Sequence, residues 1–225
     1  MTLRLVIFDV DGTLVDSIAF VERVMADAHH ACGLPLPAPG AVRALVGVSL
    51  PGLLAQLHPG LSDTDLNRLQ RSYMDLYAAA SSEASVDVSA PLFPGTRDML
   101  EDLARHDDLL LAIATGKSRR GLTRLLAQHE MDGHFVSTQV ADDHPSKPHP
   151  SMALTALVEA GVAAEDAILV GDTTFDMDMA RAAGVFGVGV GWGNHAADHV
   201  APSADHMIDD WHGLRELVGT RWGMA

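Results

Sequence analysis

Residues 8–17 read FDVDGTLVDS, and this stretch decides how the rest of the chain must fold. It continues an apolar run, residues 3–8, whose lack of polar alternation is typical of a strand buried on both faces of a parallel sheet. Two carboxylates, Asp9 and Asp11, then stand at alternate positions, and Gly12 permits a turn that can bring both toward one pocket. Like charges at such short range raise each other's pKa unless a cation lies between them. The acid pair therefore indicates a site for a divalent metal ion.

A long helical block follows this stretch. Between residues 17 and 82 apolar residues recur at helical spacing, and no strand pattern interrupts them. The expected helices cover residues 17–32, 41–46, 49–57 and a longer segment that begins at Ser62. The small and polar residues at 81–91 then predict a linker.

Beyond residue 94 the pattern changes to helices that alternate with short apolar or β-branched runs. These runs cover residues 109–114, 135–140, 167–170 and 185–190. Such alternation predicts an α/β fold, in which crossover helices connect the strands of a parallel sheet. The N-terminal strand needs partners in that sheet. The helical block must therefore be an insertion between the first strand and the rest of the α/β part.

Composition and charge limit the possible partners. The 225 residues carry a formal net charge of −15, which argues against nucleic acid and anionic membranes. No apolar stretch approaches the length of a membrane span, no signal peptide is recognisable, and the single cysteine, Cys32, cannot form an intramolecular disulfide. We therefore expect a cytoplasmic protein. As a separate expectation, the protein is a monomer or a homodimer.

Three further polar motifs follow predicted strands or lie in a stiff loop. Thr115 and Gly116 end a predicted strand, where a hydroxyl and backbone N–H groups can bind an anion. Lys147, one of only two lysines, lies in HPSKPHPS, whose prolines stiffen the loop. Asp172 and Asp176 follow another predicted strand, and ligands gather at the carboxyl ends of parallel strands. The hard oxygen atoms of these two acids suit Mg²⁺.

Taken together, the four motifs resemble those of the haloacid dehalogenase superfamily of phosphohydrolases. DxDGT at residues 9–13, a Thr at a strand end, a Lys before a Pro and GDxxxD at 171–176 occur in the order typical of that family. The resemblance covers nearly the full length of the chain. It implies a Rossmann-like, three-layer α/β core with a parallel sheet, formed by residues 1–16 and 90–225. An α-helical cap domain, residues 17–89 including the linker, is inserted into that core.

The resemblance also implies a role for each site residue. Asp9 is expected to attack phosphorus and form an aspartyl-phosphate, and Asp11 to protonate the leaving oxygen and then to activate water. The expected catalytic residues are Asp9, Asp11, Thr115 and Lys147. The expected substrate contacts come from Gly12, Thr115, Gly116 and Lys147. The implied cofactor is Mg²⁺, held by Asp9, the backbone carbonyl of Asp11, Asp172 and, directly or through water, Asp176.

Absences narrow the activity within the superfamily. Haloacid dehalogenation does not use the second acid, which is present here as Asp11, and phosphonate hydrolysis of the known kind needs a cap lysine, which the chain lacks. Related sugar-phosphate mutases carry a cap histidine where this chain has Val21, and their GVSR loop reads GVSL at residues 47–50. The closest resemblance is to the phosphoglycolate phosphatase-like group. The expected activity is thus Mg²⁺-dependent hydrolysis of a small, phosphoglycolate-like phosphate monoester.

Several alternatives stay open at the level of sequence. A pyrophosphatase, a nucleotidase or a sugar-phosphate phosphatase would share all four motifs, while a phosphosugar mutase and a non-catalytic phosphate-binding regulator are less favoured. A signalling receiver domain also gathers acids, Thr and Lys around Mg²⁺, but its acceptor aspartate lies on a later strand. Cap residues near 46–49 are expected to select the substrate, and Arg43 to be solvated. His195 could line the mouth of the pocket, whereas Trp192 is expected to pack.

Overall fold

A single parallel sheet organises the computed structural model, which describes residues 2–83 and 90–223. Its six strands lie in the order β3-β2-β1-β4-β5-β6, and every neighbouring pair is parallel. The strands are β1 (Arg4–Phe8), β2 (Leu109–Thr115), β3 (Ser137–Val140), β4 (Ala167–Gly171), β5 (Phe186–Val190) and β6 (His206–Ile208). Later strands are added on both sides of β1, so the strand order reverses there. The carboxyl end of β1 is consequently the crevice where such sheets bind their ligands.

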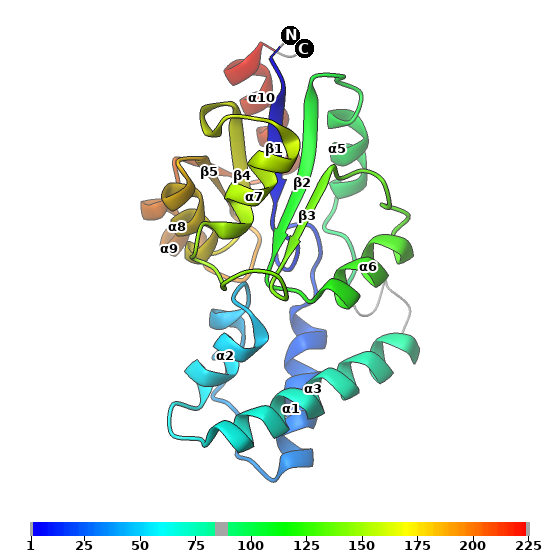
Figure 1. Ribbon diagram of the computed structural model, residues 1–225, viewed down its shortest axis with the longest axis vertical. Coiled ribbons are helices and arrows are strands. Elements are labelled where there is room, and N and C mark those ends of the chain that lie inside the picture. Colours follow the sequence, from blue (N-terminus) through cyan, green and yellow to red (C-terminus); the bar gives the residue numbers. More distant parts are fainter. Residues whose placement is uncertain (1, 84–89, 224–225) are drawn as a thin grey trace.

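Helices cover both faces of this sheet, which gives the layers visible in Figure 1. Alternate residues of β1 point to opposite faces, with Val6 and Phe8 in one apolar cluster and Leu5 and Ile7 in another. The first face is covered by α5 (Thr96–Leu103), α6 (Arg119–Gln128) and α10 (Trp211–Trp222). The second face is covered by α7 (Ser151–Ala160), α8 (Thr174–Ala183) and α9 (Ala197–Val200). The predicted three-layer α/β core is confirmed, and β6 adds a strand that the sequence pattern did not reveal.

A separate group of helices lies beyond the carboxyl ends of the strands. It consists of α1 (Ile18–Cys32), the 3₁₀ turn Arg43–Leu45, α2 (Leu50–Leu57) and α3 (Asp63–Glu83). These helices pack around an apolar cluster of their own, which includes Met25, Leu54 and Leu69. Figure 1 shows them below the sheet, on the side away from both ends of the chain. We call this group of helices the cap and the sheet with its flanking helices the core.

The predicted linker at residues 81–91 is described only in part. α3 continues to Glu83, so the first residues of the expected linker are helical, and residues 84–89 lie outside the described residues. Where the described chain returns to the core, the backbone N–H of Asp16 donates to the carbonyl of Pro91 at 2.8 Å. The two crossings between cap and core therefore run side by side.

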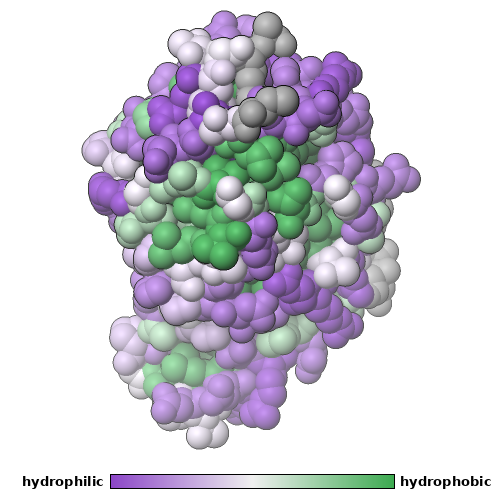
Figure 2. All heavy atoms as spheres, turned by 45° about the horizontal axis from the view of Figure 1, so that its top comes forward, coloured by the Kyte–Doolittle hydropathy of each residue, from purple (hydrophilic) through white to green (hydrophobic). Residues whose placement is uncertain are grey.

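The surface of the molecule is mixed in character. Figure 2 shows a group of apolar residues near the centre of one face, surrounded largely by hydrophilic residues. The described apolar side chains with high exposure include Leu154 and Val158 of α7, at 45% and 80%. None of the described helices combines the length and the apolar character needed to cross a membrane.

Candidate active site

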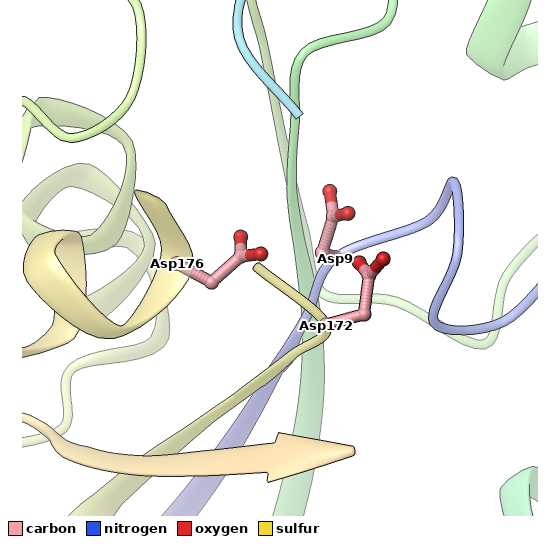
Figure 3. A group of neighbouring side chains, drawn as sticks. All are labelled: Asp9, Asp172 and Asp176. Atoms are coloured by element: carbon pink, nitrogen blue, oxygen red, sulfur yellow. The ribbon is translucent and has the colours of Figure 1, made fainter. Parts of the chain in front are cut away.

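Three carboxylates from neighbouring elements meet at the carboxyl end of the sheet. Asp9 follows β1, Asp172 follows β4, and Asp176 lies in the first turn of α8. Phe8 of β1 pairs with Val170 of β4, so the first two acids leave adjacent strands side by side. One oxygen of each acid lies within 4.8 Å of the others, and all three side chains are buried. Figure 3 shows the carboxylates turned toward a common space.

Burial makes this cluster of charges costly. Removal from water raises the pKa of Asp9 to about 7, against the lowering effect of the nearby Lys147 ammonium. Burial, and then the charge of Asp9, also raises the pKa of Asp172 well above its usual value. Nζ of Lys147 lies 2.6 Å from Oδ1 of Asp9 and 2.7 Å from Oδ1 of Asp176. Burial opposes the charge of Lys147, but these two carboxylates hold its pKa above the usual value. The result is three buried acids that face one buried cation.

Asp176 is fixed by the start of its own helix. Its Oδ2 accepts hydrogen bonds from the backbone N–H of Thr173 at 3.1 Å and from the Thr173 hydroxyl at 2.7 Å. The Thr173 hydroxyl in turn accepts from the N–H of Asp176, which completes a capping box. One carboxylate oxygen therefore serves the helix start, and the other remains for Lys147. In this structure Asp176 positions the lysine as much as it contributes to the acid cluster.

Asp172 is held by the turn that follows β5 and by the first motif. Its Oδ2 accepts the backbone N–H of Asn194 at 2.7 Å, and its Oδ1 accepts the hydroxyl of Thr13 at 3.1 Å. Gly12 has a φ of +94°, and a Cβ there would lie 2.1 Å from Oδ2 of Asp172. The side-chain Nδ2 of Asn194 also donates to the backbone carbonyl of Asp11 at 3.1 Å. Glycine is thus required because the first and fourth motifs approach so closely.

The acid cluster has the character of a divalent cation site. Oδ2 of Asp9 is buried and has no hydrogen-bond partner within the described part of the chain. A buried, unpaired carboxylate oxygen is costly unless a ligand satisfies it. Asp9, Asp172 and Asp176 offer the hard oxygen ligands that divalent cations prefer, and one lysine does not balance three carboxylates. These residues therefore fit a divalent cation.

The carboxylate of Asp11 is not part of this cluster. It accepts hydrogen bonds from Nζ of Lys117 at 2.7 and 2.9 Å and from the hydroxyl of Ser17. Burial opposes the charge of Lys117, but the carboxylate of Asp11 holds its pKa above the usual value. Nζ of Lys117 also lies 5.8 Å from the centre of the Tyr77 ring in the cap. The expected proton-transfer group is thus held at the boundary between core and cap.

The loop after β2 lies directly against the cap. Thr115 is buried, and its hydroxyl accepts the backbone N–H of Lys117 at 3.2 Å. Gly116 has no room for a side chain, because a Cβ there would lie 2.7 Å from the carbonyl oxygens of Gly47 and Val48. Part of the predicted substrate-selecting segment at 46–49 therefore rests on the predicted anion-binding loop.

Hydrogen bonds also join cap and core on two sides of this contact. Nε2 of His195 bonds to the carbonyl of Ala44 at 3.1 Å, so this histidine is a buried bridge rather than a residue of the pocket mouth. On the other side Nη1 of Arg124 donates to the hydroxyl of Ser81 at 2.6 Å. Trp192 packs as expected, with its ring 4.8 Å from that of Trp211.

A cavity of about 560 Å³ lies between cap and core, with Asp9 and Asp11 in its wall. Its core wall also includes Thr115, Gly116, Lys117, Arg120 and Arg124. Its cap wall includes Met25, residues 46–51, Gln70, Tyr73, Met74 and Tyr77. Arg43, by contrast, is exposed and lies outside this lining. The cavity connects the acid cluster with the cap residues that were expected to select the substrate.

Sequence reasoning missed several residues that build the site. Lys117 was visible as one of only two lysines, but nothing in the sequence showed that it pairs with Asp11. Asn194 lies in the turn after β5, and nothing in the sequence showed that it holds Asp172. Thr173 could have been found, because a Thr three residues before an Asp at a helix start is a capping-box pattern.

This arrangement is that of an α/β enzyme whose buried acid cluster can hold a divalent cation. The chain belongs to the haloacid dehalogenase-like hydrolase family, whose sequence model matches residues 6–190. The matched span begins in β1, includes the cap and ends with β5. The resemblance inferred from the four motifs is thereby confirmed.

Individual relatives are similar over nearly the whole chain. The sequence is 33% identical over 220 residues to a protein named probable phosphatase IndB from Dickeya dadantii, covering 96% of this chain and 92% of that protein. It is 34% identical over 223 residues to a phosphoglycolate phosphatase from Pseudomonas putida, covering 94% of this chain and 78% of that protein. The structure of a haloacid dehalogenase-like family hydrolase from Streptococcus pneumoniae superposes with a TM-score of 0.81 at 25% identity, covering 96% and 98% of the two chains.

Proposed function

We propose that this protein is a Mg²⁺-dependent phosphatase that hydrolyses a small phosphate monoester through an aspartyl-phosphate on Asp9. One observation carries the proposal. Oδ2 of Asp9 is buried without a hydrogen-bond partner in the described chain, beside a buried lysine and two further acids, at the wall of a large cavity. The names of the relatives support phosphatase activity and make phosphoglycolate the first substrate to test. Pyrophosphate, nucleotides and sugar phosphates are the alternatives.

Asp9 is the nucleophile in this proposal. Its carboxylate attacks phosphorus and displaces the alcohol, which divides one difficult displacement into two easier ones. Lys147, held by Asp176, offsets negative charge on the carboxylate and on the phosphoryl group. Mg²⁺, held by Asp9, Asp172 and the backbone carbonyl of Asp11 with support from Asp176, would further stabilise charge on the phosphoryl oxygens.

The loop after β2 holds the phosphoryl group. The Thr115 hydroxyl and the backbone N–H of Gly116 are donors at the end of a strand, in the wall of the cavity. Gly12 contributes space rather than a donor, because its N–H already bonds to the carbonyl of Val15 at 2.9 Å.

Asp11 moves the protons. As a carboxylic acid it gives its proton to the leaving oxygen, and as the carboxylate so formed it later takes a proton from the water that hydrolyses the aspartyl-phosphate. Lys117 and Ser17 orient its carboxylate, which lies in the wall of the same cavity as Asp9. The alcohol of the substrate must therefore lie on the side of the cavity that faces the cap.

We keep the division of the chain into a core, residues 1–16 and 90–225, and a cap with its linker, residues 17–89, as part of the proposal. The separate apolar clusters of the two parts support it. The proposal also includes a cytoplasmic location and a monomeric or homodimeric protein. The single cysteine agrees with a reducing compartment.

Phosphate release tests the proposal directly. The purified protein is given phosphoglycolate, pyrophosphate, sugar phosphates and nucleotides with Mg²⁺, and again after removal of metal with a chelator, with Asp9→Asn as the blank. We expect release that requires Mg²⁺ and Asp9. A preference of about a hundredfold in kcat/KM, or about 2.7 kcal/mol, would identify the substrate class. Absence of release from every compound, by a folded protein that binds Mg²⁺, would instead support a phosphate-binding regulator.

A further inference from the structure

We propose that the substrate is a phosphate monoester whose alcohol carries a large, flat, uncharged ring, and that this ring lies against Tyr73 and Tyr77 of the cap. The inference rests on the proposed phosphatase activity and selects among the substrate classes that it leaves open. Three observations carry it: the size of the cavity with the cap docked, the aromatic face of α3, and the distribution of charge over the two walls.

The cavity is large although the cap already touches the core. The backbone N–H of Ser49 donates to the hydroxyl of Ser146 at 2.7 Å on one side, and Arg124 bonds to Ser81 on the other. The remaining volume of about 560 Å³ falls in the range of about 300–1,000 Å³ that is usual for pockets of drug-sized ligands. Phosphoglycolate carries only one CH₂ group and one carboxylate on its phosphate. It would leave most of the cavity to water.

The aromatic part of the wall comes from one face of α3. Tyr73 and Tyr77 are the only tyrosines of the chain, lie one turn apart and both line the cavity. Their ring centres are 5.7 Å apart, and Met25 and Met74 also line the cavity. Flat rings and thioethers are the groups that bind an aromatic ligand with little need for hydrogen bonds.

The two tyrosines also lie close to the reacting groups. Nζ of Lys117, which is paired with Asp11, is 5.8 Å from the centre of the Tyr77 ring. Burial, then the neighbouring Tyr77 and the charge of Asp11, raise the pKa of the Tyr73 phenol well above its usual value. The Tyr77 ring therefore lies beside the Lys117–Asp11 pair, and Tyr73, whose ring centre is 5.7 Å from that of Tyr77, stays neutral.

The charges of the walls disfavour an acidic alcohol part. Among the described residues that line the cavity, the only charged side chain of the cap is Asp75. The cations belong to the core: Lys117 is paired with Asp11, Arg124 bonds to the cap, and Arg120 is exposed. A carboxylate on the alcohol would meet no cation on the cap wall, so an uncharged ring fits this surface better.

A matched pair of substrates tests the inference. Uridine 5′-monophosphate and adenosine 5′-monophosphate each consist of a ribose 5-phosphate unit with a base attached. Ribose 5-phosphate is the same sugar phosphate without a base. For the unmodified protein with Mg²⁺ we expect kcat/KM for at least one nucleotide to exceed that for ribose 5-phosphate and for phosphoglycolate by about tenfold or more, the size of effect that a stacked base produces.

Substitution of Tyr73 then locates the effect. Tyr73→Leu keeps an apolar side chain in the cap cluster but removes the ring, so kcat/KM for the preferred nucleotide should fall about tenfold while that for ribose 5-phosphate changes less than about twofold. Tyr73→Phe, the matched control, keeps the ring and should retain the preference. Titration calorimetry of the same ligands with Asp9→Asn should show the same difference in affinity, because binding is then measured without turnover.

Two results overturn the inference while leaving the phosphatase proposal intact. One is hydrolysis of phosphoglycolate or ribose 5-phosphate at least as efficient as that of both nucleotides. The other is an equal loss for all substrates in Tyr73→Leu. If no compound releases phosphate, the phosphatase proposal itself fails, and the ring-binding inference fails with it.

Discussion

The two walls of the cavity use their polar groups in opposite ways. In the core wall Asp9 is buried and held by Lys147, and Asp172 and Asp176 are fixed behind it by hydrogen bonds from the backbone and side chains of neighbouring turns. The cap wall presents half-buried aromatic and apolar side chains, and the charge of Asp75 is exposed. Chemistry on a phosphoryl group needs charges at fixed positions, whereas choice among alcohols needs a surface of suitable shape. Changes in the core should therefore affect every substrate alike, and changes in the cap should affect some more than others.

The largest effect is expected for Asp9→Asn, which removes the nucleophile from the core wall. Turnover should fall at least about 10³-fold with every substrate, because an amide cannot form the aspartyl-phosphate. The melting temperature should be unchanged or higher, since one charge leaves a buried acid cluster. Phosphate release and thermal unfolding check the two parts. Asp178→Asn, on the outer side of α8 where Asp178 pairs with Arg181, is the control and should keep its activity. Unchanged phosphate release by Asp9→Asn would contradict the nucleophile assignment.

Lys147→Met should lower both activity and stability. It leaves Asp9 and Asp176 without their shared buried cation, and loss of one partner from such a group costs about 3–5 kcal/mol in the free energy of unfolding. Lys117→Met breaks a pair that retains some exposure to solvent, so its cost should be smaller. Urea unfolding of both variants without metal measures the difference. Equal stability of the two variants would contradict the expectation that loss of the more deeply buried Lys147 costs more free energy of unfolding than loss of Lys117.

Gly116→Ala tests the contact between the two walls. The added methyl group would lie 2.7 Å from two carbonyl oxygens of the cap, so the cap must move away from the loop that holds the phosphoryl group. We expect kcat/KM to fall about tenfold for all substrates, because small displacements in a site are costly. Gly60→Ala in the cap, where a Cβ meets nothing within 4 Å, is the control for the same substitution. Full activity of Gly116→Ala would mean that the cap does not rest on this loop during turnover.

The smallest effect on stability is expected for substitution of His58 in the cap. Nε2 of His29 lies 2.7 Å from Nε2 of His58, and Nδ1 of His29 bonds to the carbonyl of Met25 at 2.6 Å. Burial and the neighbouring His29 lower the pKa of His58. Its contribution to stability is therefore present above the unfolded-state pKa of about 6.5 and is lost as the pH falls through the lower folded-state value.

Thermal unfolding as a function of pH measures this contribution. Between pH 7 and pH 5 the melting temperature should decrease more for the unmodified protein than for His58→Gln. Equal decreases in the two proteins would show that His58 does not contribute to the pH dependence of stability.

The fold class followed from local patterns, and the structure confirms it. The run at residues 3–8 lacks polar alternation because both faces of β1 are covered, and the helical spacing at 18–32 reflects one face of α1 on the cap cluster. Strand β6 was not predicted because it has only three residues. The end of α3 was predicted too early because small polar residues continue this helix into the expected linker.

The sequence by itself determined the chemical inventory of the site: two acids after the first strand, a hydroxyl after the second, a lysine in a stiff loop and two acids near a helix start. Only the tertiary structure decided which of these groups touch. Lys147 reaches Asp9 across 138 residues of chain, Lys117 reaches Asp11 across 106, and the two tyrosines face the same cavity as these pairs. The reason is physical. Local patterns depend on neighbours within a few residues, whereas these contacts depend on strand order and on how the cap docks, which no short stretch of sequence encodes.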